Sequence, residues 1–297
     1  YQRRVRGMDI DIPGYKQLEK LGEGTYGEVY KMQDLKTLEF LALKKIRLDN
    51  PEEGVPGTAL REISILRELQ HENVVRLQRV VFQQSQLCML FEYCDSDLRK
   101  FMSRYELDAA LVREFSRQLV GATFYLHSMR VMHRDLKPQN ILVKFLKQKF
   151  QLKIADFGLA RSFQCPIRGY THEIITLWYR PPEVLLGCKL YSTEVDVWSI
   201  GCILAEMLLG HPLFQARSEI EMLFEIFQKL GTPNELTWPG VEKLKDFSCQ
   251  FPKFVGKPVG EFVRIGEEWQ RELLEGMLQM DPNKRIGLQR AMEIMGM

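Results

Sequence analysis

The order of strand-like and helical segments is the feature that most constrains the fold of this chain. Residues 15–93 contain four short segments rich in apolar and β-forming residues, at 15–21, 29–32, 38–46 and 87–93. One amphipathic helix over 58–69 interrupts them. From about residue 97 the apolar spacing becomes helical, at 109–127, 195–209, 219–230 and 269–280. The sequence therefore predicts a bilobal α+β fold, with a small β-rich lobe (14–93) that contains one key helix and a larger helical lobe (94–297).

One face of the predicted 58–69 helix carries a charge among apolar residues. Ala59, Ile63, Leu66 and Leu69 share this face at helical spacing, and Glu62 is its one charged residue. Because a carboxylate that points toward a core usually needs a partner, we expect Glu62 to have one.

The composition argues against several classes of protein. The 41 Lys and Arg residues nearly balance the 39 Asp and Glu residues, which disfavours a strongly cationic nucleic-acid binder and an acidic disordered chain. The six cysteines form no Cys-x-x-Cys pair, so neither a zinc site nor a disulfide framework is indicated, and a cytoplasmic or nuclear location is expected. No apolar run is long enough to span a membrane, and we expect neither a membrane nor a nucleic-acid partner.

Residues 1–13 are predicted to lie outside the domain, as an N-terminal extension or an artificial remnant. The basic residues 1–7 lack the apolar stretch that follows in a signal peptide. Met8 could be an alternative start, and residues 1–7 are then either a tail or a remnant.

A glycine-rich turn lies between two of the predicted strands. Gly22-Glu-Gly24-Thr-Tyr-Gly27-Glu-Val29 matches G-x-G-x-x-G-x-V. A dinucleotide-binding fold carries such glycines between a strand and a helix, with an acidic residue about 20 positions further on. Here the residue 17 positions after Gly27 is Lys44, in a strand-like segment, and a cation suits phosphates rather than a ribose. An ordinary hairpin is the alternative for the glycines alone.

The strongest motif is His133-Arg134-Asp135-Leu136-Lys137-Pro138-Gln139-Asn140. Asp156-Phe157-Gly158 follows 21 residues after Asp135, and Pro181-Pro182-Glu183 comes later. With these motifs the chain closely resembles eukaryotic protein kinases from about residue 14 to residue 286. The resemblance implies a protein kinase fold and transfer of a phosphoryl group from ATP with Mg²⁺ as the metal.

The resemblance also implies a role for each motif residue. Asp135 would accept the proton of the substrate hydroxyl, and Lys137 would neutralise the γ-phosphate. Lys44 would hold the α- and β-phosphates, with Glu62 orienting it as an ion pair. Together with Lys137, Thr176 points to serine or threonine as the acceptor.

The implied ligand contacts fall into two groups. Asn140 and Asp156 would supply the hard oxygen ligands that Mg²⁺ prefers. The residues implied for nucleotide binding are Leu21, Gly22, Glu23, Gly24, Gly27, Val29, Ala42, Lys44, Phe91, Glu92, Cys94, Asp97 and Leu142.

Two segments resemble the cyclin-dependent kinases, and most closely their cell-cycle branch. Residues 51–63 are similar to the cyclin-binding helix, which implies a cyclin partner that docks on residues 54–63. The segment 166–183 agrees with this family, whereas a mitogen-activated kinase would carry Thr-x-Tyr where Tyr170 directly precedes Thr171. Gly57 stands where the family usually has Ser. Because glycine within a helix costs about 1 kcal/mol relative to Ala, and Ser caps a helix terminus better, we expect the helix to be poorly placed in the free chain, with Glu62 away from Lys44 until a cyclin docks.

Regulation by phosphorylation is implied at two places, through activating and inhibitory kinases. A phosphate on Thr171 would bind Arg61, Arg134 and Arg161, which otherwise repel one another. A phosphate on Thr25 or Tyr26, at the tip of the glycine turn, would repel ATP.

The segment that includes Ile175 and Arg180 resembles the one that selects proline after the acceptor, which implies Ser/Thr-Pro substrates. The Glu183–Arg285 ion pair of the family is expected.

The chain departs from the family in two places. The basic and aromatic stretch 144–152 is longer than usual, and an enlarged hairpin facing solvent is expected there rather than a contact with nucleic acid or membrane. Arg217 replaces an acid, so a small accessory subunit is doubtful. Two alternatives stay open: a catalytically silent, cyclin-binding pseudokinase and a cyclin-independent kinase.

Overall fold

The computed structural model describes residues 12–24, 27–46, 55, 57–83, 86–147, 149–162 and 177–297. The described residues form two compact units, one up to Asp95 and the other over Ser96–Met297.

The first unit is built on a five-stranded antiparallel sheet with the order β1-β2-β3-β5-β4. The strands are β1 (Tyr15–Gly24), β2 (Gly27–Asp34), β3 (Phe40–Ile46), β4 (Leu77–Gln83) and β5 (Gln86–Glu92). The four strands that the sequence predicts are confirmed, and β4 is an edge strand that it missed. The centre of β5 is buried on both faces, and Cys88 and Leu90 pack with Met32 and Leu43 on one of them.

Among the described residues of this unit there is one helix, α1 (Gly57–Glu68), and it contacts β4. It begins and ends one residue before the predicted bounds. The predicted face is buried, including Ile63, Leu66 and the charged Glu62, which is only 4% exposed. The amphipathic pattern therefore identified correctly which side of the helix meets the core.

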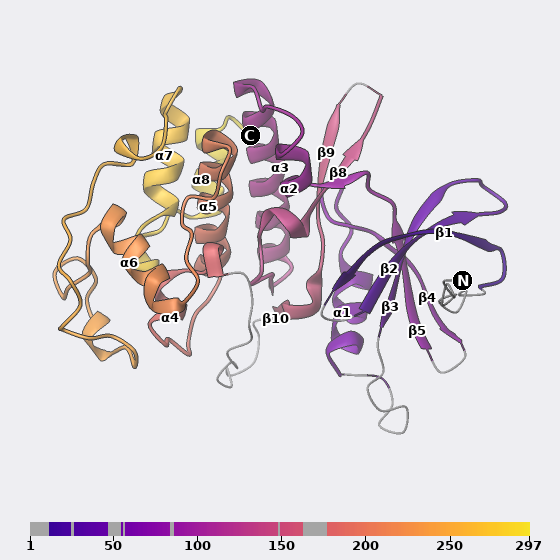
Figure 1. Cartoon of the computed structure of the whole chain (residues 1–297), viewed down its shortest axis with the longest axis horizontal. Helices are drawn as coiled ribbons and strands as arrows, with labels where there is room; N and C mark the ends of the chain where they lie inside the picture. Colours follow the sequence, from indigo (N-terminus) through magenta and orange to yellow (C-terminus); the bar gives the residue numbers. More distant parts are fainter. Residues whose placement is uncertain are drawn as a thin grey trace, which may run out of the picture. The chain divides into compact units, whose positions relative to one another are not determined.

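The second unit is mainly helical (Figure 1). Its helices are α2 (Leu98–Met102), α3 (Ala109–Ser128), α4 (Pro182–Leu185), α5 (Glu194–Leu209), α6 (Glu219–Leu230), α7 (Glu268–Met277) and α8 (Leu288–Ile294). The predicted helices are confirmed, although α7 ends before the predicted residue 280. Helix α5 runs through the middle of the unit beside α3 and α7, and nearly all its residues are buried (Figure 1).

Short strands and turns hold the motif loops of the second unit. Strand β7 (Val131–Met132) pairs with β10 (Arg161–Ser162), and β6 (Ser96–Asp97), β8 (Ile141–Phe145) and β9 (Phe150–Ile154) form a three-stranded sheet. The loop 133–137 therefore leaves β7 and enters β8 through the 3₁₀ turn Pro138–Asn140. The described part of the chain contains no helix that is long and apolar enough to cross a membrane.

Candidate active site

The glycine-rich turn joins β1 and β2, with Gly22 opposite Val29 and Gly24 opposite Gly27. The glycines thus lie between two antiparallel strands, as expected, and not between a strand and a helix. Gly27 has φ +150°, and a Cβ atom there would lie 1.7 Å from the carbonyl oxygen of Lys45, so this position requires glycine. The predicted phosphorylation sites Thr25 and Tyr26 lie outside the described residues.

Lys44 of β3 and Glu62 of α1 form an ion pair. Lys44 Nζ lies 2.8 Å from Glu62 Oε1 and 3.2 Å from Oε2, and both side chains are largely buried. The expectation that Glu62 lies away from Lys44 in the chain alone is therefore wrong. Burial of side chains such as Ile63 and Leu66 is worth about 1.5–3 kcal/mol each, which outweighs the roughly 1 kcal/mol that Gly57 costs.

The other nucleotide-binding candidates of the first unit lie on its strands and at its end. Ala42 of β3 stands opposite Phe91 of β5, whose ring is buried. Glu92, at the end of β5, is held to the loop before β4, because its carboxylate accepts a hydrogen bond from the Arg76 backbone N–H and its own backbone N–H donates to the Arg76 carbonyl. Cys94 follows and is partly exposed. Leu21 and Glu23 of β1 are exposed.

The remaining two candidates, Asp97 and Leu142, belong to the second unit and pair across β6 and β8. Asp97 is also the N-cap of α2. Its Oδ1 accepts the Lys100 N–H at 2.8 Å, and its Oδ2 lies 3.1 Å from Lys100 Nζ. The carboxylate therefore has a structural task besides the predicted ribose contact.

The loop 133–140 brings three predicted catalytic and metal-binding side chains together. Asp135 Oδ2 accepts hydrogen bonds from Lys137 Nζ and from Asn140 Nδ2, each at 2.8 Å. Asn140 Nδ2 also donates to the Asp135 carbonyl at 2.9 Å. Burial raises the pKa of the Asp135 carboxyl above its ordinary value, and the nearby Lys137 ammonium opposes this shift. The result is a largely buried carboxylate, 11% exposed, that is held in place by a cation and an amide.

Asp196 of α5 anchors this loop to the helical core. Its carboxylate accepts hydrogen bonds from the backbone N–H groups of His133 and Arg134 at 2.9 and 2.8 Å, and it lies 2.9 Å from His127 Nε2. Burial by itself raises the pKa of Asp196, but the His127 contact and the other hydrogen bonds hold it below its ordinary value. The sequence analysis did not assign Asp196 to the site. The 195–209 segment is apolar apart from Asp196 and Glu206, and an acid inside such a segment was the signal that could have found it.

Asp156 follows β9 in a left-handed backbone conformation, with φ +64°. The next residue, Phe157, is buried and its ring packs 5.0 Å from that of His133. The segment after β9 is thus joined to the loop 133–140 through the Phe157–His133 ring contact, and the Ala155 carbonyl lies 2.9 Å from His133 Nε2.

The three predicted phosphate-binding arginines have different surroundings. Arg61 is exposed on α1, and Arg161 lies in β10. Arg134 Nε donates to the Leu159 carbonyl at 2.7 Å. Its Nη1 donates to the hydroxyl of Tyr191 at 3.2 Å, and Tyr191 was not identified from the sequence. Their proposed ligand, Thr171, lies outside the described residues.

The predicted acceptor-binding segment is only partly described. Ile175 and Thr176 lie outside the described residues. Arg180 Nη1 donates to Glu219 Oε1 of α6 at 2.8 Å, so this arginine is held by the protein itself. The neighbouring Trp178 Nε1 donates to the Ala216 carbonyl at 2.9 Å, which ties the same segment to the chain before α6.

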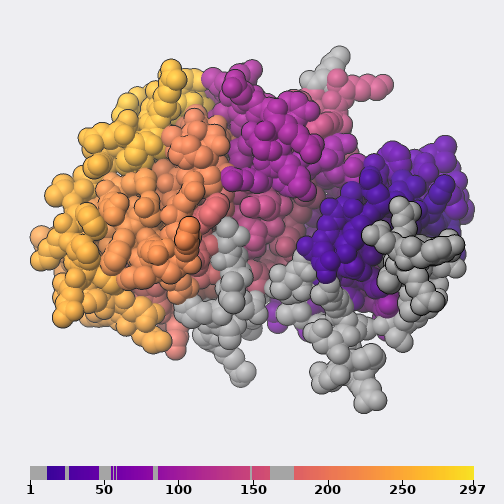
Figure 2. Space-filling view, viewed as in Figure 1, coloured from indigo at the N-terminus to yellow at the C-terminus, as the bar shows by residue number. Residues whose placement is uncertain are grey.

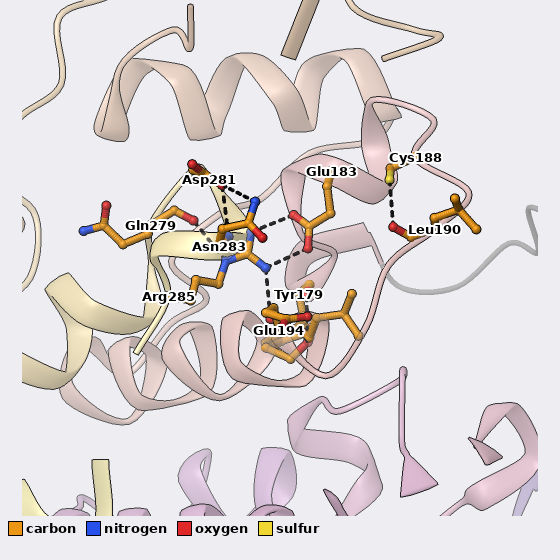
Figure 3. A network of polar contacts seen from close by, with 11 residues as sticks. Tyr179, Glu183, Cys188, Leu190, Glu194, Gln279, Asp281, Asn283 and Arg285 are labelled. Atoms are coloured by element: carbon orange, nitrogen blue, oxygen red, sulfur yellow. Dashed lines mark hydrogen bonds and ion pairs between the residues drawn. The ribbon is translucent and has the colours of Figure 1, made fainter. Parts of the chain in front are cut away.

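The predicted Glu183–Arg285 ion pair is confirmed (Figure 3). Arg285 donates from both terminal nitrogens to the two carboxylate oxygens, at 2.7 and 2.6 Å, and both side chains are buried. Arg285 also donates to the carbonyls of Gln279 and Glu194, so α4 is connected to α5 and to the loop after α7 (Figure 3).

A comparison with protein families agrees with this arrangement. Residues 15–295 match the model of the protein kinase domain. That domain implies ATP as a cofactor, usually with Mg²⁺, and the five-stranded sheet followed by a helical unit is the α+β fold expected for it. Because the match covers nearly the whole chain and includes every motif described above, this chain belongs to the protein kinase family and is an ATP-dependent protein kinase.

Proposed function

We propose that this kinase is a cyclin-dependent serine/threonine kinase that modifies Ser/Thr-Pro sites and takes part in cell-cycle control. The observation that carries the choice of acceptor is the contact of Lys137 Nζ with Asp135 Oδ2 at 2.8 Å. In the family that this chain resembles, a lysine two residues after the catalytic aspartate accompanies serine and threonine acceptors.

The proposed reaction uses Asp135 as the base. The acceptor hydroxyl oxygen forms a bond to the γ-phosphorus, the bond from that phosphorus to the bridging oxygen of ADP breaks, and the hydroxyl proton passes to Asp135. Lys137 neutralises charge on the transferred group. Lys44, oriented by Glu62, does the same for the phosphates of the leaving group. Both lysines are already paired with carboxylates, so little reorganisation is needed when ATP binds.

The donor set fits Mg²⁺. Asn140 uses its amide nitrogen for two hydrogen bonds to Asp135, which leaves its Oδ1 as the atom for a cation. Asp156 would supply a carboxylate, and hard oxygen ligands are those that Mg²⁺ prefers. When bound, the metal neutralises charge on the phosphates.

The proposed cyclin-docking surface lies on α1 and just before it. Leu60 is 55% exposed although it lies in the middle of an amphipathic helix, and Val55 is half-buried. An apolar side chain that the kinase itself does not cover is available to a partner. A small accessory subunit is not part of this proposal, because Arg217 stands where the family usually has an acid. The backbone N–H of Arg217 donates to the Glu221 carboxylate at 2.9 Å.

One observation favours a second candidate, a cyclin-independent kinase. The Lys44–Glu62 pair is formed in the chain alone, at 2.8 Å. A cyclin would then not be needed to bring these two residues together.

The test is phosphate transfer from radiolabelled ATP to peptides that differ at one position. We expect a Ser-Pro peptide to be modified at least tenfold faster than its Ser-Ala and Tyr-Pro counterparts, and faster when a cyclin is added. Asp156→Asn is the inactive control. Equal rates for Ser-Pro and Ser-Ala would contradict the proline preference, full activity without cyclin would select the second candidate, and no transfer would indicate a pseudokinase.

A further inference from the structure

A cluster of aromatic rings fixes the β8–β9 hairpin to α2 and the start of α3. Phe101 is at its centre and is only 1% exposed. The centroids of four rings lie within 6 Å of the Phe101 centroid: Tyr105 at 4.8 Å, Phe150 at 5.0 Å, Phe115 at 5.7 Å and Phe145 at 5.9 Å. Most of these contacts are edge-to-face, the geometry that aromatic pairs prefer.

The backbone of the hairpin is anchored as well. β9 is an edge strand of its sheet, and Gln118 of α3 covers its outer hydrogen-bonding groups. Gln118 Oε1 accepts the Leu152 N–H at 2.7 Å, and its Nε2 donates to the Phe150 carbonyl at 3.2 Å. The hairpin is therefore a rigid support, and this part of its edge is not open to strand addition.

The outer side of this support is apolar and basic. Phe145 is 41% exposed, Leu146 37% and Tyr105 48%. Lys147 and Lys149 are exposed beside them, and the stretch 141–155 contains no Asp or Glu. Among the described residues, neither of these two ammonium groups has a carboxylate partner. The hairpin projects from the helical unit at the upper edge of the view (Figures 1 and 2).

Acidic residues near this surface are few among the described residues, and Glu114 of α3 is engaged, since its Oε1 accepts a hydrogen bond from Gln118 Nε2 at 2.8 Å. Glu106 and Asp108 follow Tyr105 in the loop before α3, and Asp108 is occupied as the N-cap of α3, where it accepts the Leu111 N–H at 2.7 Å. A further basic side chain, Arg104, precedes Tyr105 and is exposed. The local charge thus favours an anionic partner.

We propose that this hairpin surface, formed by Tyr105, Phe145, Leu146, Lys147 and Lys149, binds an acidic peptide segment of a partner protein that carries a Leu or Phe among its carboxylates. The half-exposed apolar side chains would receive the Leu or Phe, and the lysines would pair with the carboxylates. A single-stranded nucleic acid is less well matched, because the Phe145 ring is already engaged with two other rings and few cations are present. The inference does not depend on which acceptor the kinase phosphorylates.

The test is fluorescence anisotropy of the full chain with a labelled peptide, Glu-Asp-Leu-Glu-Phe-Asp. We expect saturable binding that weakens as NaCl rises from about 50 to 300 mM. Lys147→Glu combined with Lys149→Glu should weaken it by about tenfold or more. Leu146→Ser should weaken it separately. Each variant should keep the thermal unfolding midpoint of the parent, because the substituted side chains are exposed or half-exposed.

The matched control combines Lys253→Glu and Lys257→Glu, which makes the same change in net charge at exposed sites in the loop after α6. This control should leave binding unchanged. The proposal would be overturned by no binding, by an equal loss in the control variant, or by equal affinity for a peptide with Gln in place of Leu and Phe. Tighter binding of a 12-nucleotide oligothymidylate, or of phosphatidylserine vesicles, would overturn it in favour of those ligands.

Discussion

Replacement of Glu183 by Gln removes one charge from a completely buried ion pair. The side chains of Arg285 and Glu183 are 0% and 2% exposed, and two short contacts of 2.6 and 2.7 Å join them. The substituted amide would keep the shape and one acceptor, but the Arg285 guanidinium would remain buried without its counter-charge. Breaking a buried pair in this way costs about 3–5 kcal/mol. Since 1 kcal/mol moves the Tm of a 150–250-residue domain by about 2–4 °C, we expect a drop on the order of 6–20 °C.

Urea unfolding followed by tryptophan fluorescence measures the effect as a change in midpoint at constant slope. Trp198 reports on the site directly, because the Arg285 guanidinium lies 5.0 Å from its ring. The control is Glu293→Gln, which breaks an exposed pair with Arg290 at 3.0 Å and should cost less than about 1 kcal/mol. Adding Arg285→Met to Glu183→Gln should cost less than the sum of the two single changes. A loss below about 1 kcal/mol for Glu183→Gln would refute the reasoning.

Two further predictions concern the glycine turn and the catalytic loop. Gly27→Ala should destabilise the first unit by at least about 2 kcal/mol, because its Cβ would meet the Lys45 carbonyl at 1.7 Å, whereas Gly22→Ala, with no atom within 4 Å, should unfold at nearly the parent midpoint. Similar unfolding midpoints for both variants would count against this reading. Lys137→Met should move the acidic limb of the pH profile of kcat/KM to higher pH. Burial raises the pKa of Asp135 and Lys137 opposes the shift, so removing this cation leaves the base protonated up to a higher pH. A limb that stays in place, or moves to lower pH, would show that Asp135 is not the titrating base.

The sequence predicted the larger helices and strands of the fold well, because the spacing of their apolar residues is regular. Helices α3, α5 and α6 carry long apolar patterns of helical period, so each could be recognised without its neighbours. Strands such as β4, β7 and β10 were missed, because a strand of two residues, or an edge strand with a weak pattern, exists only through its partner. The same limit applies to α1. Its sequence revealed a weak start at Gly57, but the burial of Ile63 and Leu66, which seats the helix, depends on the sheet behind it.

For the candidate site, too, part could be predicted from the sequence and part only from the structure. The motifs that resemble those of protein kinases located the candidate residues Lys44, Asp135, Lys137, Asn140 and Asp156, because this family carries the cations and oxygen ligands of phosphoryl transfer at these motif positions. The motifs did not predict the supports around these residues. Tyr191 reaches Arg134 from the segment after α4, and Asp196 reaches the backbone of His133 across 63 residues.

The sequence by itself determined the chemistry of this protein: which acids, amides and cations are present and which of them are neighbours within one loop. Only the tertiary structure decided which distant charges meet. The family resemblance implied the Lys44–Glu62 and Glu183–Arg285 pairs, but nothing in the sequence predicted that Arg99 pairs with Glu206, 107 residues away, or Arg180 with Glu219. The physical reason is that a buried charge is strongly destabilising without a partner, so packing selects the arrangement in which each buried carboxylate meets a cation or a backbone donor.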